Sequence, residues 1–354
     1  MKVTINDVAR LARVSKSTVS RVLNKSGPVS PDTERLVKQA VSLLNYSPSL
    51  LGRSLATKKS YSIAVIVPDI RNPFFAHVCW KAERIMKENG YSAIICNTDN
   101  QTSEELTYLK LMKDRSVDGI LLAGVVGDAT NIINFKAREG IPVVLFDVSV
   151  TGYDIPTVTL DDIYGGYEIT QYLISLGHRK IAFATSDVTY AERQRLEGYK
   201  IALRENGIPF DESLIIVNDE SRWRAAECPE LVELLNSRGR PTAIFCSNDI
   251  KAVRTYEILR ESGLRVPEDI SVTGYDDIDL ARVISPPLTT MAQPIDEMVV
   301  VGTSMLISEL KGEAIQERHK ELKPKLVIRQ SCAPPATVQT GIAGSVSFAA
   351  TAGG

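Results

Sequence analysis

The first part of the chain follows a helical period, in which apolar side chains recur every three or four positions. Three short amphipathic segments are visible before residue 46, and a residue able to cap a helix stands at the start of each. These residues are Thr4, Ser15 and Ser30, the last followed by Pro31 at a favoured first helical position. We expect the apolar sides to form a small common core. In the third segment the inward positions would be Leu36, Val37, Ala40, Leu43 and Leu44.

From residue 62 the pattern changes to short β-rich apolar runs that alternate with helical segments. The runs occupy residues 63–67, 93–96, 119–123, 143–146, 180–184, 214–217, 243–246 and 270–274. Alternation of this length predicts parallel sheets covered by helices on both faces, hence an α/β fold behind an all-α head. Eight such units could form one barrel or two doubly wound halves. The charged, turn-rich segment 154–166 interrupts the chain midway and favours two halves.

Composition narrows the class of protein. The chain has 354 residues, of which 44% are hydrophobic and 24% charged, as is ordinary for a soluble protein of two or three domains. It has no apolar run of about 18 residues and no apolar stretch near its N-terminus, so we expect no membrane span, no secretory signal and a cytoplasmic location. Five scattered cysteines and three histidines indicate neither a disulfide framework nor a metal site. The small, Gly/Ala-rich residues 334–354 predict a disordered tail and argue against a tetramerising coiled coil.

Charge is distributed unevenly along the chain. Residues 1–60 contain eleven Lys or Arg and three Asp or Glu, a formal charge of +8, whereas the whole chain carries −2. A basic head on an acidic body indicates a polyanionic partner for the head. Two helices joined by a tight turn, then a third helix, predict a helix-turn-helix domain that binds DNA. A basic helical subdomain that binds a protein is the alternative.

The second helix of the head offers side chains for reading DNA. Its outer face carries Lys16, Ser17, Ser20 and Arg21. Side chains near the start of such a helix reach base edges in the major groove. An arginine there can pair bidentately with guanine, which is worth about 1–3 kcal/mol of discrimination.

The core offers polar and aromatic residues directly after its strands. In open α/β sheets, ligands lie beyond the carboxyl ends of the strands. The residues found there are Asp69, Phe74, Phe75, Arg193, Arg195, Asn248, Asp249 and Asp276. Together they suit a hydroxyl-rich ligand, with a ring stacked on an aromatic side chain and hydroxyls held by charged groups. Several also have an ordinary alternative role: core packing for the phenylalanines, helix capping for Asp249 and Asp276, and a surface ion pair with Glu197 or Glu192 for Arg195.

An enzymatic core receives no support from sequence motifs. The chain lacks a G-x-G-x-x-G sequence after a strand, a phosphate-binding G-x-x-x-x-G-K-[ST] loop and a nucleophile elbow. The acidic pairs Asp161-Asp162 and Asp276-Asp277 are adjacent in sequence, so both members of a pair are not expected to face one cleft as a catalytic dyad. We therefore expect no enzyme and no cofactor.

The head sequence "VTINDVARLARVSKSTVSRVLN" closely resembles that of the LacI/GalR family of bacterial transcription regulators. So do "NYSPSLLGRSLATKKSYSIAVIVPDIRNPFF", "RPTAIFCSNDIKA", "GYDDIDLARVISPPLTT" and "KPKLVIRQS", and the resemblance covers residues 3–333. It implies a homodimer that holds a pseudo-palindromic site in double-stranded operator DNA. It also implies a core related to periplasmic sugar-binding proteins, with a small-molecule effector between two subdomains.

The resemblance also assigns roles to single residues. It implies base reading by Lys16, Ser17 and Arg21, and effector binding by Phe75, Arg195, Asp249 and Asp276. Asp161 matches a position near the cleft, and Trp223 stands where the family often has an aromatic cleft wall. The positions that usually support the phosphate backbone are occupied by Thr4, Ser15, Thr18, Asn24 and Tyr46. Several arginines near Arg193 raise the hypothesis of an acidic effector.

With the resemblance, the chain divides into a DNA-binding domain (1–47), a hinge helix and linker (48–60), a core (61–333) and a tail. Within the core, the N-subdomain would hold 61–160 and 293–320, and the C-subdomain 161–292 and 321–333. The hinge helix would present Arg53 and Leu55 to DNA, with Leu55 wedged into the minor groove at the operator centre. A leucine resting on the core surface is the alternative.

The resulting expectation is a repressor of a carbohydrate-utilisation operon, released from DNA by a sugar or sugar acid. The alternative within the same family is a global carbon-catabolite regulator whose DNA binding is promoted by a corepressor.

Overall fold

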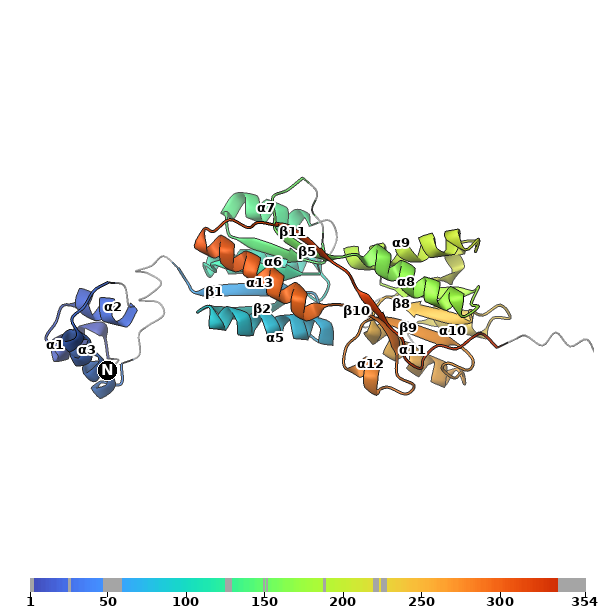
Figure 1. Cartoon of the computed structure of the whole chain (residues 1–354), viewed down its shortest axis with the longest axis horizontal. Coiled ribbons are helices and arrows are strands. Elements are labelled where there is room, and N and C mark those ends of the chain that lie inside the picture. Colours follow the sequence, from blue (N-terminus) through green and yellow to red (C-terminus); the bar gives the residue numbers. More distant parts are fainter. Residues whose placement is uncertain are drawn as a thin grey trace, which may run out of the picture.

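The computed structural model describes residues 3–24, 27–46, 59–124, 129–148, 150, 152–186, 189–218, 223 and 228–336. The head comprises α1 (Ile5–Ala12), α2 (Lys16–Asn24) and α3 (Pro31–Leu43), and the core comprises two α/β units (Figure 1). The predicted arrangement of a helical head and two doubly wound halves is confirmed, and the barrel alternative is excluded by two separate six-stranded sheets. No helix in the described part of the chain is both long and apolar enough to cross a membrane.

The head helices begin where the capping residues predict. The Ser15 hydroxyl accepts from the Thr18 backbone N–H at 3.1 Å, and the Ser30 hydroxyl accepts from the Thr33 N–H at 3.3 Å. The Thr4 hydroxyl and backbone N–H both donate to Asp7, at 2.7 and 3.0 Å. These bonds satisfy N–H groups and a hydroxyl that would otherwise have no partner at a helix start.

The expected inner face of α3 is partly wrong. Val37 and Ala40 are buried in the head core and Leu44 packs against it, but Leu36 is 46% and Leu43 is 79% exposed. Leu36 and Leu43 are seven residues apart and therefore share a stripe of the helix. That stripe lies beside the inward one, and only the inward stripe meets α1 and α2.

The N-subdomain is a parallel sheet in the order β11-β5-β4-β3-β1-β2. Its strands are β1 (Ser62–Val67), β2 (Ser92–Asn97), β3 (Gly119–Ala123), β4 (Val143–Phe146), β5 (Thr157–Leu160) and β11 (His319–Leu322). One apolar core joins the sheet to α5 (Pro73–Glu88) and α13 (Ile295–Lys311). A second joins the opposite face to α6 (Thr102–Asp114) and α7 (Thr130–Glu139).

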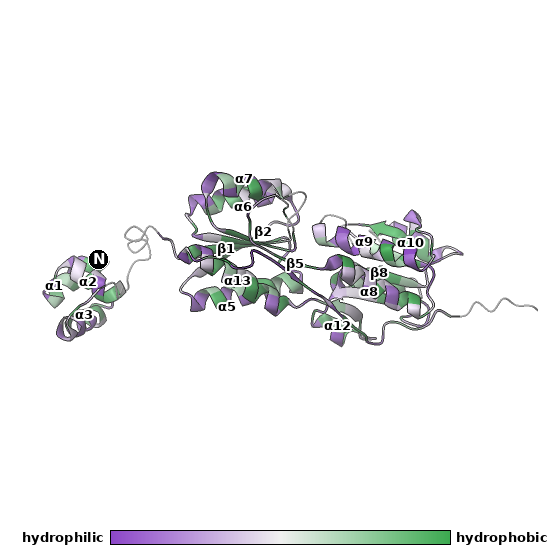
Figure 2. Cartoon of the chain, turned by 45° about the horizontal axis from the view of Figure 1, so that its top comes forward, coloured by the Kyte–Doolittle hydropathy of each residue, from purple (hydrophilic) through white to green (hydrophobic). Residues whose placement is uncertain are grey.

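The C-subdomain repeats this plan in the order β12-β10-β9-β8-β6-β7, with β12 antiparallel to β10. Its strands are β6 (Ile181–Thr185), β7 (Ile215–Val217), β8 (Ala243–Cys246), β9 (Ser271–Asp276), β10 (Thr289–Ala292) and β12 (Lys325–Val327). One face packs on α8 (Asp162–Ser175) and α9 (Tyr190–Glu205), the other on α10 (Pro229–Asn236) and α11 (Asp249–Glu261). The turn η1 (Glu212–Leu214) precedes β7, and α12 (Leu280–Val283) precedes β10. Hydrophobic and hydrophilic residues alternate around the helices, as a one-sided packing requires (Figure 2).

The chain passes between the two units three times (Figure 1): after β5, after β10 and after β11. The last crossing, expected at about residue 320, comes after Leu322, the final residue of β11 that pairs with β5. The segment 154–166 is also not a simple break. It contains β5, in which Thr157, Val158 and Leu160 are buried, and the start of α8.

Candidate functional site

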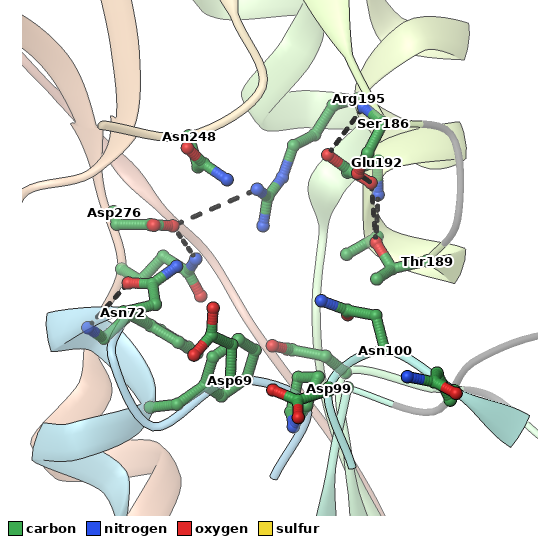
Figure 3. A pocket seen from close by; sticks show the side chains of 18 residues that line it. Asp69, Asn72, Asp99, Asn100, Ser186, Thr189, Glu192, Arg195, Asn248 and Asp276 are labelled. Carbon is green, nitrogen blue, oxygen red and sulfur yellow. Dashed lines mark hydrogen bonds and ion pairs between the residues drawn. The ribbon is translucent and has the colours of Figure 1, made fainter. Parts of the chain in front are cut away.

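A cavity of about 240 Å³ lies between the two subdomains, at the carboxyl ends of strands from both sheets (Figure 3). Residues 68–147 contribute one wall, residues 186–276 contribute the other, and Gln293 comes from the second crossing. The lining residues are Pro68, Asp69, Asn72, Phe74, Phe75, Asp99, Asn100, Gln101, Gly124, Asp147, Ser186, Thr189, Ala191, Glu192, Arg195, Asn248, Asp276 and Gln293. Six of the residues proposed from the sequence are among them: Asp69, Phe74, Phe75, Arg195, Asn248 and Asp276.

Arg195 is held on several sides. It is only 5% exposed, and its Nε donates to Asp162 Oδ1 at 2.8 Å while its Nη1 donates to the Ser247 carbonyl at 2.7 Å. The guanidinium carbon lies 3.7 Å from the centre of the Tyr275 ring, and Asp276 is 3.9 Å from Nη1. A buried charge is tolerated only when it is paired and hydrogen-bonded, and each of these contacts serves that need.

Glycines bring the Arg195 helix close to its partner helix. A Cβ atom on Gly166 of α8 would stand 2.2 Å from the Arg195 carbonyl oxygen, and one on Gly198 of α9 would stand 2.1 Å from the Ile163 carbonyl oxygen. Only glycine permits such an approach, since a side chain would meet backbone atoms that cannot move independently. This approach allows Asp162 at the start of α8 to reach Arg195.

The N-subdomain wall is built around the start of α5. The Asn72 side chain caps this helix by accepting from the Phe74 N–H at 3.0 Å. Phe74 and Phe75 pack edge to face, with ring centres 5.0 Å apart. A Cβ on Gly124 would lie 3.1 Å from the Phe75 ring, so a glycine there keeps room for the aromatic side chain.

A second polar cluster surrounds Glu192. Its carboxylate accepts from Ser186, Ser247 and the ammonium group of Lys251. Burial disfavours the charged carboxylate, but Lys251 and the serine donors outweigh it and lower the pKa of Glu192. Glu192 is therefore an anion under physiological conditions.

Asp147 follows β4 and reaches the cavity as a buried acid. Its Oδ1 lacks a hydrogen-bond partner among the described residues, and the backbone has a left-handed φ of 56°. Burial, together with the neighbouring charge of Asp162, raises its pKa to about 8, although Arg195 acts in the opposite direction. At neutral pH this carboxyl group can therefore donate as well as accept a hydrogen bond.

Four residues proposed from the sequence as cleft residues do not line this cavity. Asp161 caps α8 by accepting from the Tyr164 N–H at 2.9 Å, and its neighbour Asp162 is the residue that reaches Arg195. Arg193 is exposed on α9 and is not among the residues that line the cavity.

The other two corrections concern buried side chains. Trp223 is fully buried in the core beneath α10 and α11, where its indole N–H donates to Thr255 at 3.1 Å. Asp249 is also fully buried and accepts from the Thr290 hydroxyl and the Ile278 N–H, so it joins β10 to the segment after β9 behind the cavity wall. Chain order placed Asp249 near a strand end and the family resemblance placed Trp223 at the cleft, but neither could reveal which way the side chain points.

Several lining residues were not on the list of sites proposed from the sequence. Asp147 directly follows a predicted strand, so the same carboxyl-end rule could have found it. Asp276 accepts from the Gln293 side chain at 2.6 Å, but Gln293 follows β10, a strand the pattern did not reveal. Glu192 was read only as a surface partner of Arg195.

Comparisons with known proteins agree with this architecture. Residues 4–49 match the family described as bacterial regulatory proteins, lacI family, and residues 170–332 match a periplasmic binding protein-like domain. The HTH-type transcriptional regulator DegA of Bacillus subtilis is 36% identical over 337 residues, which cover 94% of this chain and 99% of that one. The chain belongs to the LacI family.

Further relatives place this LacI-family chain among repressors. The ribose operon repressor of Haemophilus influenzae is 36% identical over 93% of this chain and 98% of its own. The structure of the lac repressor dimer bound to operator and the anti-inducer ONPF aligns with a TM-score of 0.83 at 28% identity, covering 94% of this chain and all of that one. A LacI family regulator from Enterococcus faecium with bound ribose aligns with a TM-score of 0.69 at 32% identity, covering 78% and 100%. This chain is a DNA-binding transcription regulator of the repressor type and not an enzyme.

In this LacI-family head, the proposed base-reading side chains are accessible. Lys16, Ser17 and Arg21 are exposed on α2, opposite the buried Val19 and Val22. Ser20, the fourth residue of the predicted outer face, is half-buried. Of the residues proposed for the DNA backbone, Thr4 and Ser15 are exposed caps, Thr18 is half-buried, Tyr46 packs against the head core, and Asn24 ends α2. Arg53, Leu55 and the expected hinge helix lie outside the described residues.

Proposed function

We propose that this regulator represses a carbohydrate-utilisation operon as a homodimer and leaves its operator when a neutral monosaccharide occupies the cavity between the subdomains. The observation that carries the proposal is the chemistry of that cavity. Two phenylalanines, several amides and several carboxylates converge there. Stacking on aromatic rings and hydrogen bonding to carboxylates and amides are the contacts that a sugar ring offers.

Charge favours a neutral effector over a sugar acid. Arg195 is the only cationic side chain among the described lining residues, and it is already paired with Asp162. The Arg195 wall also carries Glu192 and Asp276, and the facing wall carries Asp69 and Asp99. An anionic ligand would meet more carboxylates than cations, and like charges at close range in a poorly hydrated site repel. Arg193, which suggested an acidic effector, does not line the cavity.

Size favours a single ring. The cavity of about 240 Å³ is smaller than the roughly 300–1,000 Å³ typical of sites for drug-sized ligands. Two structural relatives are consistent with these choices: one holds ribose and another holds operator DNA.

Coupling between ligand and DNA follows from the architecture. A ligand that touches both subdomains favours one angle between them, and in a dimer this angle changes how the two heads are spaced. By linkage, a sugar that weakens operator binding must itself bind less tightly to the operator-bound protein. We further propose that Leu55 transmits this change at the operator centre. Action on operator DNA in a bacterial cell places the regulator in the cytoplasm.

The decisive experiment is a thermal-shift screen of the full-length protein. The neutral arm contains D-ribose, D-xylose, D-glucose and D-galactose, and the anionic arm contains D-glucuronate, D-gluconate and ribose 5-phosphate. We expect a rise in Tm with at least one neutral sugar and with none of the anions. A hit restricted to the anionic arm would overturn the neutral-effector proposal.

The direction of control is tested on DNA. The operator is selected from random duplexes, and binding is measured with and without the hit. Weaker binding with the sugar supports release, whereas tighter binding identifies the corepressor alternative.

A further inference from the structure

Lys251 and Glu192 form a buried ion pair at the cavity wall, in which Glu192 lines the cavity and Lys251 does not. Lys251 projects from the first turn of α11 with a fully buried side chain, and its Nζ lies 3.2 Å from Oε1 of Glu192, which is 6% exposed and sits in the first turn of α9. Removing two charges from water is costly, and such a pair adds little net stability compared with apolar side chains of similar size. Stability alone therefore does not explain why the pair is here.

The Glu192 carboxylate is saturated by donors from this chain. Oε1 accepts from the Ser186 N–H at 3.2 Å, the Ser247 hydroxyl at 2.7 Å and Lys251. Oε2 accepts from the Ser186 hydroxyl at 2.6 Å and the Thr189 hydroxyl at 3.4 Å. A carboxylate has about four lone-pair sites, so Glu192 has little capacity left to bind a ligand even though it lines the cavity.

These donors come from the segments that carry the cavity wall. Ser186 follows β6 and Ser247 follows β8, so one carboxylate ties together the carboxyl ends of two strands that are neighbours in the sheet. Ser247 also accepts from Arg195 Nη1 through its carbonyl, at 2.7 Å, and the next residue is the lining residue Asn248. A continuous path of hydrogen bonds thus runs from Lys251 through Glu192 and Ser247 to Arg195.

We propose that Glu192, neutralised by Lys251, is a positioning residue that sets the geometry of Arg195 and of the strand ends after β6 and β8, and thereby the effector specificity of the cavity. The part concerning the effector rests on the proposed function. Lys251 allows Glu192 to remain an anion, and the anion is what holds both serines. Neither residue is expected to touch the ligand.

A set of variants distinguishes the proposed effect on effector affinity from an effect on protein stability. Lys251→Met and Glu192→Leu each leave one uncompensated buried charge, so both should lower Tm and effector affinity. The double variant Glu192→Leu/Lys251→Met removes both charges and should recover most of the lost Tm. It still lacks an acceptor for Ser186 and Ser247, so effector affinity should remain roughly ten-fold or more below that of the unmodified protein. As a matched control, Lys113→Met/Glu139→Leu removes an ion pair between α6 and α7, away from the cavity, and should leave affinity unchanged.

Two measurements test the positioning role of Glu192. In the ligand-free full-length protein, ¹⁵N NMR follows solvent exchange of the Arg195 Nε–H, assigned with Arg195→Lys; exchange should accelerate at least ten-fold in the double variant but not in the control. Calorimetry with D-ribose, or with the neutral sugar that gives the largest Tm rise, measures affinity. If affinity recovers together with Tm, or if Arg195 exchange is unchanged, the positioning role is wrong. If no sugar binds the unmodified protein, the proposed effector class fails, while the exchange measurement still decides the positioning role.

Discussion

Arg195 and Asp162 form an ion pair with almost no contact with solvent, with Nε 2.8 Å from Oδ1 and side-chain exposures of 6% and 3%. The two residues are 33 positions apart and come from different helices, α9 and α8. The pair holds the Arg195 cation in the cavity wall. Asp162 neutralises much of the positive charge of Arg195 in the absence of a ligand. This relationship supports the proposal that the effector is neutral, because the one lining arginine among the described residues already has a counter-charge.

Replacing Asp162 should lower the stability of the protein, because the buried Arg195 cation would lose its counter-charge. Asp162→Asn keeps the size of the side chain but leaves Arg195 without its closest counter-charge, and we expect a loss of about 3 kcal/mol in the free energy of unfolding. Urea denaturation measures the loss. Asp161→Asn is the matched control, because asparagine also caps a helix well and Asp161 makes the capping bond. Equal stability of the two variants would contradict the importance of the pair.

Asp147 should make stability depend on pH. Its pKa is raised to about 8 by burial and then by Asp162, whereas the ordinary value is 3.8. Between these values the folded chain holds a proton that the unfolded chain releases, so stability falls as pH rises from about 4 to about 8. Asp147→Asn should flatten this fall in Tm between pH 5 and pH 8. Asp99→Asn, at an exposed carboxylate of the cavity mouth, should retain the original slope, and a retained slope in Asp147→Asn would refute the assignment.

The contact between α8 and α9 should not tolerate a side chain at Gly198. The Cβ of Gly198→Ala would lie 2.1 Å from the Ile163 carbonyl oxygen, so the helices must separate. We expect a loss of about 1–3 kcal/mol in unfolding free energy together with weaker sugar binding, because Arg195 moves with α9. Glu197→Ala, an exposed position on the same helix, serves as the control and should change neither quantity appreciably. An unchanged unfolding midpoint for Gly198→Ala would show that the helices adapt.

In the head, Arg21→Ala should weaken binding of the protein to the selected operator DNA by about 1–3 kcal/mol. The Tm of the core and the affinity for the sugar should not change. Fluorescence anisotropy at constant salt measures the loss, and binding should decline steeply as salt rises. Arg35→Ala, an exposed arginine on α3, is expected to have a smaller effect. Similar losses for both arginines would indicate a general charge effect without base reading.

Leu55→Ser tests the hinge prediction, which rests on the sequence. We expect operator affinity to fall at least ten-fold, about 1.4 kcal/mol, with no change in sugar affinity. Operator binding at the original strength would favour the alternative in which Leu55 rests on the core surface.

The local pattern of apolar and polar residues was sufficient to predict most strands, the helix starts of the head and part of the cavity lining. The eight apolar runs predicted as strands all coincide with strands of the two sheets to within a residue or two. The reason is that parallel strands buried on both faces consist of short continuous runs of apolar residues. Ser15 and Ser30 mark true helix starts because capping is a local bond. The carboxyl-end rule found Phe75, Arg195 and Asp276 because strand direction, and hence the edge where loops gather, follows from alternation alone.

Tertiary structure decided what each side chain meets. Asp161 and Asp162 are neighbours in sequence, yet one caps a helix and the other pairs with Arg195, because successive positions at a helix start point in different directions. Asp249, at the start of α11, is internal for the same reason, and Trp223 is buried in the core of the C-subdomain. The strand β5 was missed because its alternating threonines carry a weak apolar signal. The pairing of Glu192 with Lys251 joins residues 59 positions apart. The sequence alone thus determined the family, the fold and the edge of the sheets where the cavity lies, whereas the charge of the cavity and its supporting bonds depend on long-range packing that no local period encodes.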